Sequence, residues 1–209
     1  GYLDFITGGW WGKTLVWREN PKGQPVDWKT HRIDECGSIE TTRAWDVDGD
    51  GELEIAPNTP GGPLVFYKLI HDKEGRGTGQ FRRFQVCEGP SGHGLGFGDI
   101  AGKGRGAFVM SGGWLEAPAD PVNERWIFHP EFELGCASVP IIVADINGDG
   151  LVELIAGQAH GYGLDYYRQR FTRSGKRKWV RHPIDPYFSQ YHEMHYVDID
   201  CDGQCELIT

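Results

Sequence analysis

Several patterns that assign a chemistry directly are missing from this sequence. It contains no Gly-x-Ser-x-Gly nucleophile elbow, no phosphate-binding loop and no dinucleotide fingerprint. No stretch sustains a 3.6-residue apolar period, and this favours an all-β chain. Long apolar runs and signal-peptide patterns are absent as well.

Basic clusters and paired cysteines are also scarce. The net charge is −9, and the one basic stretch, residues 168–178, reads as the solvated edge of a hairpin. We therefore expect neither a nucleic-acid partner nor insertion into a membrane. The five cysteines include no pair of CxxC motifs and form no disulfide framework; free thiols fit Cys201 and Cys205 better than a local disulfide.

What the chain does have is an acidic nine-residue loop that occurs three times, at residues 46–54, 145–153 and 198–206. Each loop places oxygen donors at positions 1, 3, 5 and 9 and a glycine at position 6, where the chain must turn sharply. Hard carboxylate and amide oxygens in this order are typical of calcium loops. The expected Ca²⁺ ligands are Asp46, Asp48, Asp50, Glu54, Asp145, Asn147, Asp149, Glu153, Asp198, Asp200, Asp202 and Glu206. Three bound ions would reduce the net charge to about −3.

Weaker copies extend the repeat. Residues 99–107 keep the first Asp and the glycine but lack the other acids, and residues 1–9 read as the end of a further loop and the strand after it. From Asp46 to Asp99, Asp145 and Asp198 the steps are 53, 46 and 53 residues. A period near 50 residues is typical of propellers and repeat arrays.

Each repeat also contains signals for four short strands, the last of which carries Trp-x-x-His or, in one repeat, Phe-x-x-Phe. These pairs are Trp28/His31, Phe81/Phe84, Trp126/His129 and Trp179/His182. We therefore predict an all-β fold, a β-propeller of four-stranded blades. Residues 1–209 form one propeller region of about four blade equivalents, a fragment of a larger propeller of about seven blades.

Residues that break the repeat are candidates for a site, because structural positions hold the same residue type from blade to blade. Six residues before the first Asp of each loop lie Glu40, His93, Val139 and His192, at the start of the strand expected to line the channel. His93 and His192 do not recur in every repeat. They are equally consistent with a ligand site and with ordinary packing.

A second set lies seven residues after loop position 9: Trp11, Gly61, Trp114 and His160. The glycines before Trp11 and Trp114 suggest exposed rings, either as platforms for a sugar or as blade-to-blade packing. Arg43 faces the channel or pairs with Glu40.

The sequence resembles the FG-GAP and VCBS repeat families, to which calcium-loop propellers of bacterial extracellular and integrin-type proteins belong. The resemblance rests on the loops and the segments "DFITGG", "FVMSGG" and "ELIAG" that follow them, and it covers nearly the whole chain. Segments such as "GQAHGYG" and "SQYHEMHYVDID" are similar to proteins of polysaccharide-degrading microbes. The resemblance implies structural Ca²⁺ and a secreted, periplasmic or extracellular location.

Two functions of different class follow. The first is binding of an extracellular glycan, polysaccharide or protein at the channel mouth, with Trp11, Trp114, His160 and Tyr162 as ligand-binding residues. The alternative is a polysaccharide lyase that cleaves a uronate-containing glycan by β-elimination. That reaction needs a base, an acid and a group that offsets the developing negative charge. The candidate catalytic residues are His93, His192, Tyr191 and Arg43.

Overall fold

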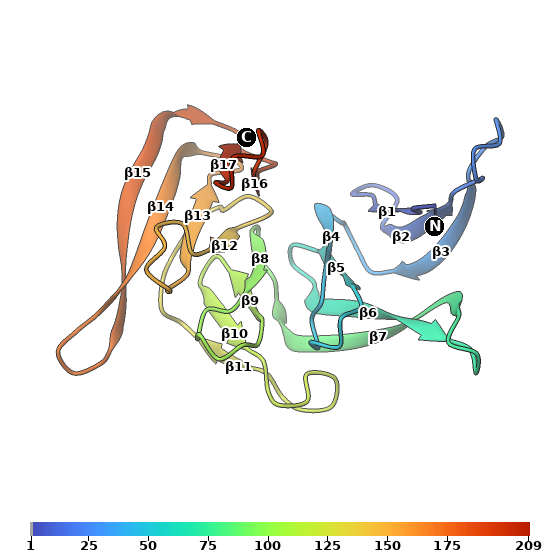
Figure 1. Ribbon diagram of the computed structural model, residues 1–209, viewed down its shortest axis with the longest axis horizontal. Helices are drawn as coiled ribbons and strands as arrows, with labels where there is room; N and C mark the ends of the chain where they lie inside the picture. The colour runs from blue at the N-terminus through green and yellow to red at the C-terminus, as the bar shows by residue number, and fades with distance from the viewer. Residues whose placement is uncertain (1) are drawn as a thin grey trace. The chain divides into compact units, whose positions relative to one another are not determined.

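The computed structural model describes residues 2–209 and contains seventeen β-strands. All the strand pairs are antiparallel, and three sheets have four strands in sequential order (Figure 1). The predicted all-β chain with four-stranded antiparallel sheets is confirmed. None of the described residues forms a helix long and apolar enough to cross a membrane.

The strands divide into two compact units. The first unit comprises the residues up to Asp46 together with Asp50–Ser91, and the second comprises Val47–Gly49 and Gly92–Thr209.

The first unit holds a three-stranded and a four-stranded sheet. The three-stranded sheet contains β1 (Phe5–Gly8), β2 (Thr14–Glu19) and β3 (Lys29–Glu35). The four-stranded sheet contains β4 (Thr41–Trp45), β5 (Glu54–Asn58), β6 (Pro63–His71) and β7 (Gly77–Pro90). Leu15 and Ile39 pack against Ile55 and Val65 between the two sheets, so apolar side chains join one sheet to the next.

The second unit holds two four-stranded sheets and a two-stranded sheet. The first contains β8 (Leu95–Gly98), β9 (Ala107–Met110), β10 (Gly113–Glu116) and β11 (Ile127–His129). The second contains β12 (Ile142–Ala144), β13 (Glu153–Gly157), β14 (Tyr162–Phe171) and β15 (Arg177–Ser189). The two-stranded sheet contains β16 (His195–Val197) and β17 (Glu206–Ile208).

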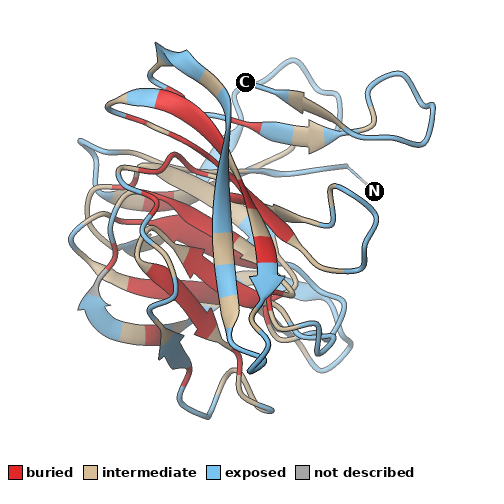
Figure 2. Cartoon of the chain, turned by 90° about the vertical axis from the view of Figure 1, so that its left-hand side faces the viewer, coloured by how far each residue is buried: buried red, intermediate tan, exposed pale blue. Residues whose placement is uncertain are grey.

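Burial in the second unit follows the same plan. Val109 and Trp114 of the first sheet pack against Leu154 and Tyr167 of the second sheet. On the opposite face of the second sheet, Ile155 joins a cluster that includes Leu207 of β17. Figure 2 shows buried residues along the strands and exposed residues in the loops. Within the second unit, apolar side chains therefore fill the space between one sheet and the next.

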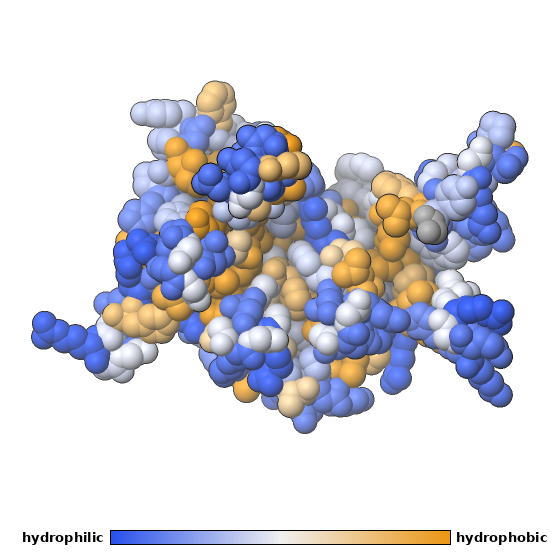
Figure 3. Space-filling model, in the orientation of Figure 1, coloured by the Kyte–Doolittle hydropathy of each residue, from blue (hydrophilic) through white to orange (hydrophobic). Residues whose placement is uncertain are grey.

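The fourth-strand pattern also has a structural reason. His31 stacks on Trp17 of the neighbouring strand and His129 on Trp114, with ring centroids 4.1 and 4.2 Å apart. In the repeat with Phe-x-x-Phe, Phe84 stacks on Phe66. The basic stretch forms the β14–β15 hairpin, whose tip projects as a hydrophilic arm in Figure 3.

A glycine sets how closely the first strands of neighbouring sheets approach. β8 and β12 lie side by side, and a Cβ added to Gly96 of β8 would lie 2.2 Å from the carbonyl oxygen of Ile141. No side chain can move to relieve that contact, because the clashing atom belongs to the backbone.

We predict that Gly96→Ala lowers the free energy of unfolding by about 1–3 kcal/mol, as overpacking does. Gly92→Ala is the matched control, since a Cβ there meets nothing within 4 Å, and it should change stability by less than about 0.5 kcal/mol. Urea unfolding of both variants checks this. Equal urea midpoints for the two variants would contradict the prediction and show that β8 and β12 tolerate a wider spacing.

Candidate functional site

The backbone holds the first Asp of all four acidic loops in the same way. Its Oδ2 accepts a hydrogen bond from the amide of the glycine at position 6. The N···O distances are 2.6–3.0 Å for Gly51–Asp46, Gly104–Asp99, Gly150–Asp145 and Gly203–Asp198. Position 4 has positive φ in each loop, and in the last loop the residue there is Cys201, with φ 63°. The turn is therefore a property of the backbone and occurs with or without a full set of acids.

The intact loops gather carboxylates tightly. One oxygen each from Asp198, Asp200 and Glu206 lies within 4.8 Å of the others, and Asp46, Asp48 and Asp50 meet the same condition. Hard oxygens at this spacing fit a divalent cation such as Ca²⁺. Carboxylates so close repel one another, and a cation relieves that repulsion.

The loop at 145–153 is linked more by hydrogen bonds. Glu153 is fully buried, its Oε2 accepts the amide of Ile146 at 3.0 Å, and the Asn147 amide donates to its Oε1. Burial raises the pKa of Glu153, and the nearby charges of Asp149 and Asp145 raise it further. These donors also fit a cation, because a positive charge offsets both effects.

Sequence reasoning missed a cationic partner of these loops. Lys68 of β6 lies opposite Glu54, and its Nζ is 2.6 Å from Asp50 Oδ2 and 3.3 Å from Glu54 Oε1. Arg168 of β14 occupies the same place opposite Glu153, with its Nη2 2.8 Å from Asp149 Oδ2. The signal in the sequence was a basic residue directly after two aromatic residues, as in Phe66-Tyr67-Lys68 and Tyr166-Tyr167-Arg168.

In the loop at 99–107 the two charges are exchanged. Position 5 is Lys103, and the cross-strand residue opposite position 9 is Glu116, to which Lys103 donates a hydrogen bond. Lys103 holds the pKa of Glu116 below its usual range, with His129 adding to the effect. An ammonium at position 5 does not fit a cation site, so this loop differs in chemistry from the other three.

Three predicted residues come together in the second unit. The ring of His160 lies 4.7 Å from that of His93 and 5.0 Å from that of His192, both in edge-to-face contact. His93 precedes β8, His160 lies in the β13–β14 turn and His192 precedes β16. Three successive sheets thus each supply one imidazole. His93 is half-buried, and the other two are exposed.

Gln158 fixes the backbone around this histidine cluster (His93, His160 and His192). Its side chain donates to the Leu134 carbonyl at 2.8 Å and accepts from the Cys136 amide at 3.1 Å. Its own carbonyl accepts the amide of Tyr191, the residue before His192. Gly157 permits this approach, since a Cβ there would lie 2.4 Å from Tyr191 Cβ. No sequence pattern marks Gln158, because its contacts join segments that are distant in sequence.

Tyr162 is 74% exposed. It opens β14 two residues after His160 and pairs with Ser189, three residues before His192. An exposed phenol offers an apolar face and a hydrogen-bonding tip.

Tyr191, one of the candidate catalytic residues, is buried. Its side chain is 8% exposed and packs in the cluster with Ile155 and Met194. The pKa of its hydroxyl is raised by burial and by Asp185, to which it is hydrogen-bonded. Tyr191 therefore packs in the core, whereas its neighbour His192 is exposed.

Of the two alternatives for Trp114, the structure fits packing and not an exposed platform. Trp114 is 3% exposed and lies in β10, between His129 and the Arg177 guanidinium, which is 5.2 Å from the ring centroid. Counting from loop position 9 failed because the hairpins differ in length. β9 and β10 are joined by two residues, whereas β13 and β14 are joined by four, so His160 lies on a turn and Trp114 does not.

Two other candidates belong to the first unit. Trp11 is 90% exposed in the β1–β2 turn. Arg43 is half-buried in β4, opposite Ala56 of β5.

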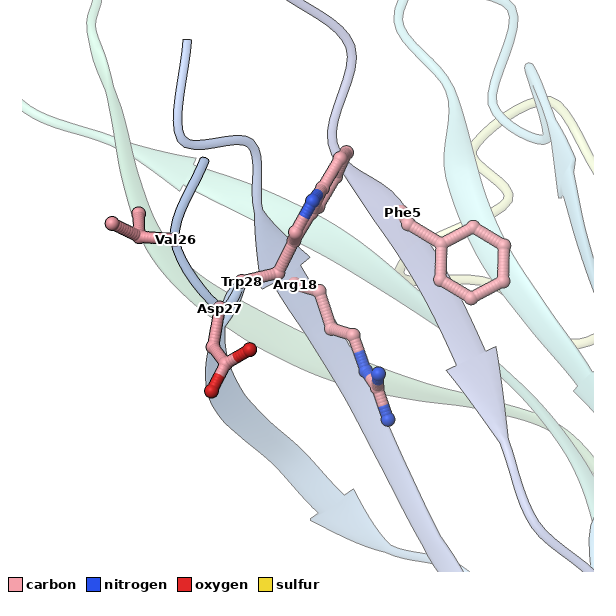
Figure 4. A pocket seen from close by; sticks show the side chains of 5 residues that line it. All are labelled: Phe5, Arg18, Val26, Asp27 and Trp28. Atoms are coloured by element: carbon pink, nitrogen blue, oxygen red, sulfur yellow. The ribbon is translucent and has the colours of Figure 1, made fainter. Parts of the chain in front are cut away.

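Figure 4 shows a separate cleft of about 540 Å³ on the β1–β3 sheet, lined by Phe5, Arg18, Val26, Asp27 and Trp28. Phe5 and Arg18 hold the repeat positions of Leu154 and Tyr167, which the β8–β11 sheet covers in the second unit. By position, this cleft therefore corresponds to a face that packs against a neighbouring sheet in the second unit.

No family model matches the chain, and no curated protein matches it. A solved structure that is similar belongs to a lectin from Agrocybe aegerita, described as specifically recognising non-reducing terminal N-acetylglucosamine. The TM-score is 0.51 at 16% identity, and the match covers 90% of this chain. The chain spans half the length of the lectin, at 50% coverage. At this identity the likeness concerns the fold.

The contrast between the two tryptophans can be tested. We predict that Trp114→Ala lowers the free energy of unfolding by about 3–5 kcal/mol, because it empties a packed core position. Trp11→Ala, at an exposed turn, should change it by less than about 0.5 kcal/mol. Chemical unfolding followed by circular dichroism measures both. A small effect of Trp114→Ala on the free energy of unfolding would show that the ring does not fill a packed core position.

Proposed function

We propose that this chain is part of a secreted, calcium-stabilised β-propeller that binds a carbohydrate at the surface formed by the histidine cluster and Tyr162. The observation that carries the proposal is the convergence of His93, His160 and His192 from three successive sheets. Side chains that come from different blades and meet at one place are what a channel-mouth site requires. The lectin-like fold supports the proposal in general terms.

The residues at this surface suit a sugar. Imidazoles donate and accept hydrogen bonds to hydroxyl groups, and the exposed Tyr162 ring offers a face on which a pyranose can stack. The hydrogen bonds of Gln158 hold the segments of His160 and His192 in place. Less conformational entropy is therefore lost when a ligand binds.

Ca²⁺ is proposed for the loops at 46–54, 145–153 and 198–206, where it would neutralise the gathered carboxylates and fix the turn between the first two strands of each sheet. We exclude the loop at 99–107 from this proposal, because Lys103 already places a positive charge at its fifth position.

A polysaccharide lyase is the second candidate, and the contact between the histidine rings favours it. In β-elimination a base removes the proton next to the uronate carboxylate, the bond to the leaving glycosidic oxygen breaks, and an acid protonates that oxygen as the double bond forms. His93 and His192 can supply base and acid, and the exposed Tyr162 replaces the buried Tyr191 as a further proton donor.

A panel of N-acetylglucosamine-terminated glycans and uronate-containing polysaccharides tests both candidates. We expect calorimetric binding that Tyr162→Ala weakens roughly three- to tenfold through lost stacking. His160→Ala should weaken it too, whereas His71→Ala, at an exposed histidine of the first unit, should not. Ultraviolet absorbance from an unsaturated product, lost in His93→Ala, would make the protein a lyase. Absence of binding to every glycan would refute the proposal.

The calcium proposal predicts that excess chelator lowers the melting temperature. Asp145→Ala should lower it and also reduce the response to Ca²⁺, because the residue serves both turn and ion. Asp99→Ala is the matched control, since Asp99 accepts the same glycine hydrogen bond in a loop without the ligand set. It should destabilise the fold and leave the calcium response intact. A melting temperature that excess chelator leaves unchanged in every variant would count against structural ions.

A further inference from the structure

We propose that His93, His160 and His192 form a binding site for one Zn²⁺ ion, distinct from the calcium loops. Imidazole nitrogen suits Zn²⁺, whereas the loops offer only oxygen, which suits Ca²⁺. The two kinds of site therefore select different metals within one chain.

The spacing of the rings supports coordination by His160 together with each of the other two histidines. A Zn–N bond is about 2.0–2.1 Å, which places each ring centroid about 3.2 Å from the ion. Two rings at a tetrahedral angle then have centroids about 5 Å apart. The observed separations, 4.7 Å for His93–His160 and 5.0 Å for His160–His192, agree with this value. His160 is the central member, because it contacts both of the others.

The rings need only turn to bind. Among residues 2–209, the groups of three ligand atoms already within 4.8 Å of one another are acidic, so the imidazole nitrogens must rotate toward a common centre. His160 and His192 are exposed, and exposed side chains change rotamer in picoseconds to nanoseconds. The hydrogen bond from the Tyr191 amide to the Gln158 carbonyl already ties the His160 and His192 segments together.

Outer groups can orient the ligands. The Gln190 amide oxygen lies 3.4 Å from His192 Nε2, and a partner of this kind holds one ring nitrogen while the other binds the metal. Three histidines leave the fourth tetrahedral position for water or a ligand hydroxyl. The proposal does not require the carbohydrate, and the metal alone is a sufficient probe.

The test uses the whole chain in millimolar Ca²⁺, which keeps the acidic loops occupied, with Co²⁺ as a coloured substitute for Zn²⁺. We expect one equivalent of Co²⁺ to give visible bands of a four-coordinate site, and Zn²⁺ to displace it. His160→Ala should abolish the bands, and His93→Ala or His192→Ala should weaken binding by more than the roughly 10–100-fold that an outer-shell loss costs. His71→Ala, near Glu52 but remote in sequence from the cluster, should bind as the parent does.

The exposed thiols of Cys201 and Cys205 are the main competitors for zinc, so Cys201→Ser/Cys205→Ser serves as a second background. Retention of the bands in this double variant and their loss in His160→Ala supports the site. Bands that survive in His160→Ala, or that vanish with the thiols, overturn it. Tyr162→Ala should leave Co²⁺ binding unchanged while it weakens glycan binding, so the two proposals fail separately.

Discussion

The hydrogen bond from the position 6 glycine to the first Asp of each loop is the constraint on which the repeat depends. It closes the turn between the first and second strands in all four loops, including the one at 99–107 that has lost most of its acids. Closing this turn sets the register of the two strands, and register decides which side chains face the neighbouring sheet. The buried filling between sheets and the position of His93 and His192 before the first strands both follow from it.

Much of this arrangement could be predicted from the sequence, because it repeats. The loops, the strand order and the fourth-strand His31 and His129 all recur with a fixed spacing and a fixed physical role. The contact of His93 and His192 with His160 also involves positions chosen from the repeat, although the contact itself depends on how successive sheets stack. No spacing rule specifies that stacking.

The failures have a common cause in hairpin length and side-chain direction. Trp114 and His160 are equally far from position 9, but a two-residue turn returns the chain into β10 in one case and a longer turn leaves His160 at its tip in the other. Tyr191 and His192 are neighbours, yet one fills the core and the other is exposed. Residue counting cannot resolve either difference, and residues 190–194 form no strand whose alternation could have separated Tyr191 from His192.

The charge exchange at Lys103 and Glu116 bears on how such loops evolve within one chain. Position 5 and the residue opposite position 9 carry opposite charges in three repeats, as Asp50–Lys68, Lys103–Glu116 and Asp149–Arg168. The ion pair therefore persists when its two charges are exchanged. The number of carboxylates in the loop is not kept. An ammonium from the loop itself can thus hold the turn where, on the calcium proposal, an ion does so elsewhere. On the calcium proposal, the ion strengthens a turn geometry that the backbone already defines. A repeat that keeps its hydrogen-bonded turn and its cross-strand ion pair can therefore lose the ion and still form its sheet.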